Sequence, residues 1–462
     1  MENKEVTQDS TLLEALELQG DVKKLTEMLE EMPTAKVIDF FKSKHTDEIL
    51  KYLSPLKLED KGRIISELDL ETIIEIFRTL ERPKFASIYK HISSDVRADL
   101  YKELSLDEQN EFLPFLDKKI REDVIILSSY PSETAGGIMT TDFATILLEM
   151  NAQEALEKLR SDAPSKKMIY YLYVVNESMK MQGILTLKDL LFAEPAAKIK
   201  DLINEFVIYA ELSEDQESVA KKIAKYDLVA IPVLNTYQQL VGIVHHDDAM
   251  DVLRAEQTED MEKFMGIVPT EDSLTYMETT TFYHFKKRVF WIIGLAAIGL
   301  ISGIIVHKFE GTLSSLMILA LYMPMMAATG GNSGSQSATV VIRAMALGEV
   351  KDSQWIKIIL KETRISMLLS VCVALLVFLN IAFLSDHVQI PETLTYFKIG
   401  FYISLAIALQ VVSSAMIGTS LPLIVKKFGG DPAVAASPAI TTFVDITGLL
   451  IYFGIVSYAL AI

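Results

Sequence analysis

The stretch 437–462, "SPAITTFVDITGLLIYFGIVSYALAI", is the last long apolar run of the chain and carries one charged residue, Asp445. About twenty apolar residues suffice for a helix to cross the hydrocarbon core of a bilayer. An ionised carboxylate at that depth costs roughly 2.5–3.5 kcal/mol and usually faces a bundle interior or a water-filled path. We therefore predict a membrane-spanning helix with Asp445 as a cation site on a transport pathway. The alternative is an Asp that is neutral or bound by the hydroxyls of Thr441, Thr442 or Thr447.

Four further apolar stretches precede this one, so the sequence predicts a five-span α-helical membrane domain. They cover 289–306, 313–329 (extended by 337–347), 365–384 and 399–425. Lys and Arg gather before the first span, between the second and third, and between the fourth and fifth. Because cytoplasmic loops are the ones enriched in these residues, we expect a cytoplasmic N-terminus and a C-terminus outside the cell membrane.

Composition supports a membrane protein that handles cations. The chain has 462 residues, 50% of them hydrophobic, and a net charge of −18. Acidic and basic residues nearly balance in 289–462, so the excess negative charge lies in the preceding part. That distribution excludes nucleic acid as a partner and suits a cation.

Cys372 is the only cysteine, which excludes a disulfide within one chain. The polar, acidic start "MENKEVTQDS" leads us to expect no cleavable signal peptide.

The second span has an unusual composition, because Pro324 lies within it and the run "GGNSGS" follows from Gly330. Proline removes a helical donor and glycine lowers helix propensity. Irregular backbone at membrane depth occurs only inside protein or along a wet cavity. We predict an unwound pore segment whose free carbonyls and Asn332 side chain face the permeating species. The alternative is a helix-packing surface made of small residues.

The soluble part divides into two regions. Apolar residues recur at helical spacing from about 11 to 123, which predicts stacked helices in an all-α superhelical N domain. Further on, "IYYLYVV" and "GILTLKDL" are followed by "VAIPVL" and "LVGIVHHDDAMDVL" in matching places. Each copy predicts a β-α-β-β-α unit of an α/β tandem module.

The paired repeats resemble a tandem of cystathionine-β-synthase (CBS) domains. With the membrane sequences "PMMAATGGNSGSQSATVVIRA" and "GGDPAVAASPAITTFVDITGLLIYF", the chain from about Leu12 onward resembles the MgtE family of magnesium channels. The resemblance implies five consecutive parts: the N domain at 1–132, CBS repeats at 133–196 and 197–257, a linking plug helix at 258–287, and the pore domain at 288–462.

The resemblance also implies a homodimer that takes up Mg²⁺ and maintains magnesium homeostasis, with Asp445 in the pore and Asp431 at its cytoplasmic mouth. The implied pore-lining residues are Pro324, Gly330, Gly331, Asn332 and Gln336. The implied magnesium-sensing carboxylates are Asp95, Asp99, Glu217, Asp227, Asp248, Asp251, Glu256, Glu259 and Asp260. A nucleotide site, possible for ATP, would use Tyr171, Lys188 and Asp189, although some family members have Arg where this chain has Lys188.

The chemistry of these residues fits a hard divalent cation. Mg²⁺ prefers octahedral oxygen ligands and sheds its waters reluctantly. One Asp from each of two subunits supplies two negative charges. The absence of Cys and His around Asp445 disfavours Zn²⁺, Cu and Ni²⁺. A transporter of Co²⁺, Mn²⁺ or Ca²⁺ is the alternative.

The acidic soluble part suggests a gate. Two like charges 4 Å apart repel by ~1 kcal/mol in water. We hypothesise that high cytoplasmic Mg²⁺ neutralises these faces, compacts the N and CBS domains and lets the linker after Asp260 close the pore, and that low Mg²⁺ releases it. The alternative is an acidic face that serves solubility only.

Three other classes of protein fit the sequence less well: an organic-solute transporter, a pure sensor and a membrane enzyme. We therefore expect no enzyme activity, and treat His245, His246 and His284 as ordinary packing or surface residues.

Overall fold

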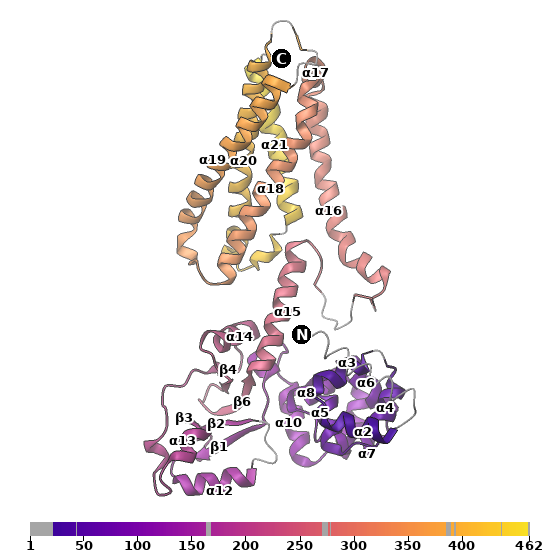
Figure 1. Cartoon of the computed structure of the whole chain (residues 1–462), viewed down its shortest axis with the longest axis vertical. Coiled ribbons are helices and arrows are strands. Elements are labelled where there is room, and N and C mark those ends of the chain that lie inside the picture. The colour runs from indigo at the N-terminus through magenta and orange to yellow at the C-terminus, as the bar shows by residue number, and fades with distance from the viewer. Residues whose placement is uncertain are drawn as a thin grey trace. The chain divides into compact units, whose positions relative to one another are not determined.

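The computed structural model describes residues 22–42, 44–162, 168–269, 276–277, 279–384, 390–391, 394–435 and 437–460. The chain forms two compact units, Met1–Ala255 and Glu256–Ile462. Each unit contains hydrophobic cores of its own. Figure 1 labels the elements of both.

The first unit begins with short amphipathic helices. They are α2 (Val22–Glu31), α3 (Thr34–Phe41), α4 (Thr46–Leu53), α5 (Leu58–Ile65), α6 (Leu70–Thr79), α7 (Arg82–Tyr89), α8 (Ser94–Glu103), α9 (Leu106–Phe112), η1 (Leu113–Phe115), α10 (Lys118–Ser128) and α11 (Ala135–Ile138). Side-chain caps start several of them: Asp69 accepts from Thr72 N in α6, and Ser105 forms a capping box with Glu108 in α9. Their apolar faces bury one continuous core, which confirms the predicted all-α N-terminal region.

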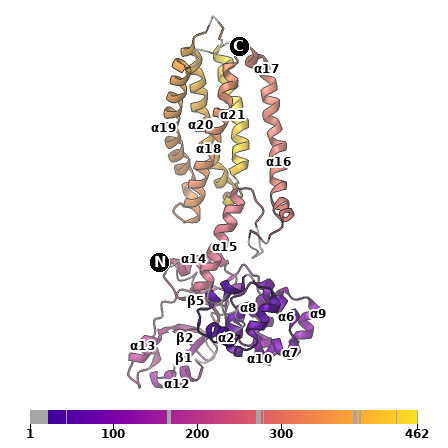
Figure 2. The ribbon, with the colours of Figure 1, turned by 45° about the vertical axis from the view of Figure 1, so that its right-hand side comes forward.

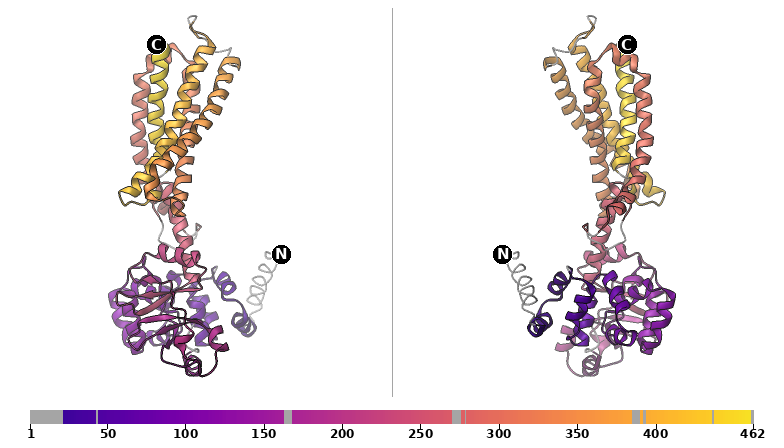
Figure 3. Two further views of the ribbon diagram at one scale, coloured as in Figure 1. Left: turned by 90° about the vertical axis from the view of Figure 1, so that its left-hand side faces the viewer. Right: turned by 90° about the vertical axis from the view of Figure 1, so that its right-hand side faces the viewer.

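The rest of this unit consists of two matching α/β repeats; their strands are drawn as arrows in Figure 3. The first contains β1 (Phe143–Leu147), α12 (Ala152–Asp162), β2 (Met168–Val175), β3 (Met181–Thr186), α13 (Leu187–Phe192) and η3 (Ile199–Asp201). The second contains β4 (Ala210–Glu211), α14 (Gln216–Lys225), β5 (Ala230–Leu234), β6 (Leu240–His245) and the start of α15 (His246–Phe264), whose residues from Glu256 on belong to the second unit. In each three-stranded sheet the central strand pairs parallel with the first and antiparallel with the last. Phe143, Tyr173 and Ile243 bring both repeats into one core, as expected for a tandem module.

The second unit is built from long helices that run alongside one another (Figure 2). Its elements are α16 (Thr281–Lys308), α17 (Glu310–Ser315), α18 (Ile318–Ala346), η4 (Asp352–Gln354), α19 (Trp355–Leu384), α20 (Tyr396–Lys427), η5 (Pro432–Val434) and α21 (Ser437–Leu460). Within the described residues, α16, α19, α20 and α21 are long and apolar enough to cross a membrane. The helix α18 is equally long, but its Gly- and Ser-rich run makes it less apolar.

The prediction of one plug helix over 258–287 is wrong. The helix α15 ends at Phe264. Gly266 then adopts φ +69, in the left-handed region, and Ile267 N donates back to Glu262 O at 2.8 Å. This glycine turn closes the helix end, because other residues take that conformation only at a cost. The next helix, α16, begins at Thr281 after a cap by Thr280.

The predicted unwinding of the second span is also wrong, because α18 is one continuous helix through Pro324 and "GGNSGS". The glycines serve close packing instead. A Cβ on Gly334 would lie 3.1 Å from Ile440 Cγ2 and 3.2 Å from Ser414 O, and a Cβ on Gly418 would lie 2.0 Å from Gly334 O. The backbones of α18 and α20 therefore approach each other through glycine, as the packing alternative expects.

Candidate functional site

Asp445 lies on α21 at the seam between α21 and α18. Ser335 and Ser437 hydroxyls meet at 2.9 Å at one end of this seam. One turn further along, a Cβ on Gly331 would lie 3.1 Å from Thr441 Cγ2. Residues four apart share a helix face, so Asp445 follows Thr441 on the face that α21 turns to this seam. The small residues of α18 thus position the carboxylate-bearing helix.

The carboxylate of Asp445 is not satisfied by its own helix. Thr441 donates to Ser437 O at 3.0 Å, Thr442 to Pro438 O at 2.9 Å, and Thr447 to Phe443 O at 3.0 Å. Among the described residues, the buried Asp445 Oδ1 has no hydrogen-bond partner. The sequence-based alternative of an Asp bound by these threonines therefore fails. A buried carboxylate oxygen without a donor is costly, and a cation would supply the missing partner.

Gln410 is part of this site, although the sequence analysis did not single it out. It is fully buried on α20 and donates from Nε2 to Val444 O at 2.8 Å, one residue before Asp445. The side chain fits because Gly330 and Gly448 flank it. A Cβ on these glycines would lie 2.6 and 2.4 Å from Gln410 Nε2. A polar Gln inside the apolar run 399–425 was the signal that could have revealed it.

The residues predicted to line the pore separate into two groups. Gly330 and Gly331 are buried against α20 and α21. Asn332 and Gln336, one turn apart on α18, are exposed in the single chain. Pro324 lies in the first half of the helix. The structure therefore offers two side-chain amides on an open face of α18.

Asp431 caps η5, in the turn between α20 and α21. Its Oδ1 accepts from Ala433 N at 2.9 Å, and its Oδ2 accepts from Lys263 Nζ at 2.8 Å. Lys263, on the last turn of α15, also lies 2.7 Å from Glu259 Oε1. Burial lowers the pKa of Lys263, but the hydrogen bonds to Asp431 and Glu259 outweigh it and hold that pKa above its usual range. A protonated lysine thus bridges two residues predicted to bind metal.

Phe264 follows directly and packs against a small buried cluster formed by Ala338, Ile440 and Val444. These residues belong to α18 and α21 beside Asp445. The end of α15 is therefore attached by an apolar contact and by an ion pair to the helices that carry the candidate cation site.

The predicted sensing carboxylates of the first unit stand on separate elements. Asp95 and Asp99 lie one turn apart on α8, and Lys102 Nζ is 3.5 Å from Asp99 Oδ1. Desolvation raises the pKa of the Asp99 carboxyl, Lys102 opposes this, and Asp95 reinforces it. Ser94 at the start of α8 contacts the Thr140 hydroxyl at 2.7 Å, so these acids stand beside the α/β repeats.

The other predicted carboxylates lie on α14, just after it, or on α15. Glu217, in the first turn of α14, pairs with Lys221 at 2.6 Å, and exposed Asp227 follows that helix with φ 51. Asp251 lies 3.1 Å from Arg254 Nη1 on α15. The remaining predicted residues, also on α15, are Asp248, Glu256, Glu259 and Asp260.

One set of possible metal ligands was missed by the sequence analysis. Within the described residues, His245, Asp247 and Asp248 are the one group of three such side chains whose ligand atoms lie within 4.8 Å of one another. His245 is buried at the end of β6, which agrees with the packing part of the prediction. Its position in the run "HHDD", two residues before Asp247, was the available signal.

The residues predicted to bind a nucleotide meet at one end of the first sheet. Tyr171 pairs in register with Thr186 across β2 and β3. The Thr186 hydroxyl caps α13 by accepting from Asp189 N at 3.1 Å. Lys188 and Asp189 are exposed in the first turn of α13.

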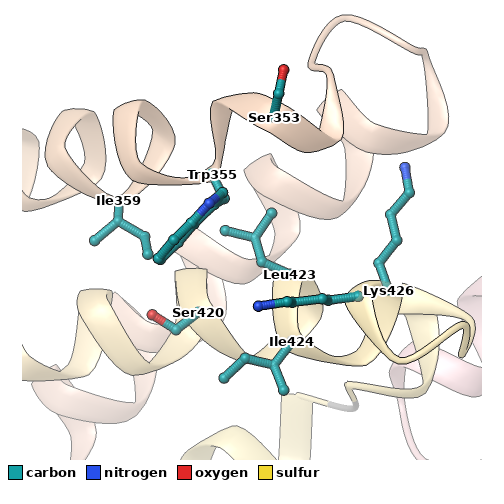
Figure 4. A pocket seen from close by; sticks show the side chains of 8 residues that line it. Ser353, Trp355, Ile359, Ser420, Leu423, Ile424 and Lys426 are labelled. Carbon is teal, nitrogen blue, oxygen red and sulfur yellow. The ribbon is translucent and has the colours of Figure 1, made fainter.

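A separate cavity of about 500 Å³ lies between the start of α19 and the end of α20 (Figure 4). Trp355 and Ile359 face Ser420, Leu423 and Ile424 across it. The complete lining is Ser353, Trp355, Ile359, Ser420, Leu423, Ile424, Lys426 and Lys427. It contains none of the predicted site residues.

Comparison with known proteins accounts for this arrangement. The family described as "Divalent cation transporter" (MgtE) matches residues 323–455. The MgtE intracellular N domain matches 32–133, and the CBS domain matches 135–195 and 199–255. The Magnesium transporter MgtE of Thermus thermophilus is 35% identical over 340 residues, covering 74% of this chain and 73% of the relative. The chain belongs to the MgtE family of magnesium transporters.

Other relatives agree with the MgtE assignment. The Magnesium transporter MgtE of Bacillus subtilis is 38% identical over 333 residues, which cover 72% of this chain and 71% of the relative. A crystal structure of the soluble part of a magnesium transporter matches with a TM-score of 0.51 at 26% identity, covering 54% of this chain and 99% of that one. The predicted family is confirmed: this is a multi-pass membrane transporter of the MgtE family with CBS domains, not an enzyme.

Proposed function

We propose that this MgtE protein is a homodimeric Mg²⁺-selective channel that takes up magnesium, with Asp445 of each subunit at the ion path. The observation that carries the proposal is the buried Asp445 Oδ1, which lacks a hydrogen-bond partner among the described residues. A second subunit would bring a second Asp445 to the path. Two carboxylates match the charge of a divalent ion, and Mg²⁺ can be held through its retained waters.

The face of α18 that carries Asn332 and Gln336 completes the proposed path. Their side-chain oxygens can accept hydrogen bonds from the water shell of the ion. Gly330 and Gly331 contribute by holding α21 close, and Pro324 lies further along the same helix. In this proposal α18 also crosses the membrane, which makes five spans together with α16, α19, α20 and α21. The N-terminus is cytoplasmic and the C-terminus lies outside, an orientation that the Lys and Arg distribution supports.

We propose that α15 carries the gate. Phe264 packs on Ala338, Ile440 and Val444, so a movement of α15 acts directly on the helices next to Asp445. Mg²⁺ bound by the acidic cytoplasmic residues at high concentration favours the position in which this contact forms. The proposed ligands are Asp95, Asp99, Glu217, Asp227, Asp248, Asp251, Glu256, Glu259, Asp260 and, at the mouth, Asp431.

A nucleotide site in the first CBS repeat is a further part of this proposal. The register pair Tyr171–Thr186 and the helix start at Asp189 place an aromatic ring, a hydroxyl and a carboxylate at one sheet end. An aromatic ring can stack on adenine, and Lys188 supplies a cation for phosphate. ATP is the proposed ligand.

The test is Mg²⁺ flux into proteoliposomes for the wild type, Asp445→Asn and Asp445→Glu, with Glu349→Gln as a control that removes an acid elsewhere. We expect Asp445→Asn to lose most flux, Asp445→Glu to retain part of it, and Glu349→Gln to match the wild type. Competition by Co²⁺, Mn²⁺ and Ca²⁺ measures selectivity. Unchanged flux in Asp445→Asn would remove this carboxylate from the path, and equal flux of all four ions would favour the general divalent-cation alternative.

A further inference from the structure

We infer that Lys263 is a built-in cation that occupies the mouth of the pathway in place of a bridging metal and sets how much Mg²⁺ is needed for closure. This inference rests on the proposed function, in which α15 gates the pore. The Lys263 ammonium lies 2.8 Å from Asp431 Oδ2 and 2.7 Å from Glu259 Oε1. These distances are typical of charge-assisted hydrogen bonds, and the bonds join α15 to the turn before α21.

Asp431 has little capacity left for a direct metal bond while Lys263 is in place. Its Oδ1 is engaged by Ala433 N and its Oδ2 by the ammonium. A divalent ion that bound Glu259 and Asp431 together would have to displace the lysine. Lys263 and the ion are therefore alternative bridges between the same two carboxylates.

The charge balance gives the direction of the effect. With Lys263 present, one positive charge offsets two carboxylates, so α15 can attach without a metal at this point. Without the ammonium, Glu259 and Asp431 repel each other, and attachment requires a divalent ion. Lys263 is thus a positioning residue that acts through α15.

The experiment measures flux in proteoliposomes against Mg²⁺ on the cytoplasmic side for Lys263→Gln, Lys263→Arg and the control Lys361→Gln, an exposed lysine of α19. At low Mg²⁺ we expect Lys263→Gln to raise flux about two- to fivefold, the range expected for loss of a partly exposed ion pair. Millimolar Mg²⁺ restores closure with a steeper concentration dependence, because one more ion is required. Lys263→Arg and Lys361→Gln match the wild type.

A charge exchange provides the second readout. Asp431→Lys alone opens the gate at low Mg²⁺, and Lys263→Asp combined with Asp431→Lys restores closure there. Wild-type closure in Lys263→Gln, or failure of the exchange to restore closure in folded protein, overturns the inference. Absence of flux in every variant, including wild type, instead overturns the proposed function, so the two failures are distinguishable.

The cavity between α19 and α20 carries a second, independent inference: we infer that it binds one anionic phospholipid of the inner leaflet, an assignment that rests on the proposed orientation. Its volume of about 500 Å³ is in the range of ligand pockets. One part of the lining is apolar and includes Trp355, Ile359 and Ile424 (Figure 4). Lys426 and Lys427 supply the positive charge.

This combination matches a lipid rather than a soluble anion. Trp355 is 49% exposed and Ile424 is 48% exposed, so an apolar surface continues outward from the cavity. Tryptophan is enriched at the membrane–water boundary, and basic pockets between spans on the cytoplasmic side bind anionic headgroups. An acyl chain would lie against Ile359 and Leu423, with the headgroup phosphate near the two lysines.

The test is native mass spectrometry of the full chain from nanodiscs that contain phosphatidylglycerol and phosphatidylcholine. We expect retained phosphatidylglycerol in the wild type, an about tenfold loss in Lys426→Gln/Lys427→Gln, and no loss in Lys398→Gln, at the other end of α20. Displacement by free glycerol 3-phosphate would indicate a soluble anion instead. Equal retention of phosphatidylglycerol in all variants contradicts the lipid site. A second chain that covers the cavity would give this result.

Discussion

Gln410 Nε2 donates to the carbonyl oxygen of Val444 at 2.8 Å, which fixes the backbone of α21 one residue before Asp445. Gln410 and Val444 are both fully buried. The bond joins α20 to α21 at the depth of the candidate ion site. It also explains why Gly330 and Gly448 flank the amide, since a larger residue at either place would collide with it.

The first prediction concerns this bond. Gln410→Leu removes the donor and keeps a similar volume, and we expect Mg²⁺ flux to fall about tenfold because the loss of a buried hydrogen bond costs about 1–3 kcal/mol. Ser413→Ala is the matched control on the same helix, since Ser413 donates to Gln410 O and only weakly to its Oε1, at 3.3 Å. Wild-type flux in folded Gln410→Leu would show that Gln410 does not position Asp445.

The second prediction concerns the glycine contact between α18 and α20. A Cβ on Gly418 would lie 2.0 Å from Gly334 O, a backbone atom that cannot move by itself. We expect Gly418→Ala to lower the melting temperature in detergent by several degrees, since overpacking costs about 1–3 kcal/mol. Gly294→Ala on α16 meets nothing within 4 Å, so it leaves stability unchanged. Equal melting temperatures for both variants would refute the close approach.

The third prediction uses the ionisation of Asp99. Its pKa is raised in the folded protein, mainly by desolvation, so the charged form destabilises the fold above that folded-state pKa. We expect Asp99→Asn to stabilise α8 at pH 7, and this gain to disappear as the pH falls to the ordinary carboxyl value. Hydrogen exchange of α8 in the full chain, compared between variants at each pH, measures the effect. The same variant weakens protection by Mg²⁺ if Asp99 is a ligand. A gain that persists at low pH would contradict the ionisation argument.

The fourth prediction tests the nucleotide site. Asp189→Ala removes an exposed carboxylate from the sheet end where Tyr171 lies, and we expect ATP binding by calorimetry to weaken at least about tenfold, or 1.4 kcal/mol. Lys188→Arg adds a forked donor for phosphate and strengthens binding. Glu177→Ala, in the turn between β2 and β3, is the control. Unchanged affinity in Asp189→Ala and Lys188→Arg would place ATP elsewhere or exclude it.

Much of the fold was readable from sequence, because it depends on local periodicity. The two β-α-β-β-α repeats and the long apolar helices follow from patterns that each segment carries by itself. The continuity of α18 did not follow. Local propensity at Gly330–Gly334 opposes a helix, but the glycines permit contacts with α20 and α21 that stabilise it. Tertiary packing thus outweighs propensity here.

The site was only partly readable for a related reason. Asp445 can be recognised from the sequence alone, because it is the one charged residue in the apolar run 437–462. The Lys263–Asp431 pair joins residues 168 positions apart, and Gln410 acts on a residue 34 positions away. No spacing rule connects them. Such partners are found only once the chain has folded.

The last prediction concerns the contact of Phe264 with Ala338, Ile440 and Val444. Phe264→Ala removes the apolar part of the attachment of α15 but leaves Lys263 and its carboxylates intact. We expect flux that resists closure at millimolar Mg²⁺, because the ion-mediated bridge then acts without the packing that transmits it to α21. Phe264→Leu keeps most of the apolar area and closes nearly as the wild type does. Flux against Mg²⁺ measures both variants. Normal closure in Phe264→Ala would mean that α15 acts through the Lys263 bridge alone.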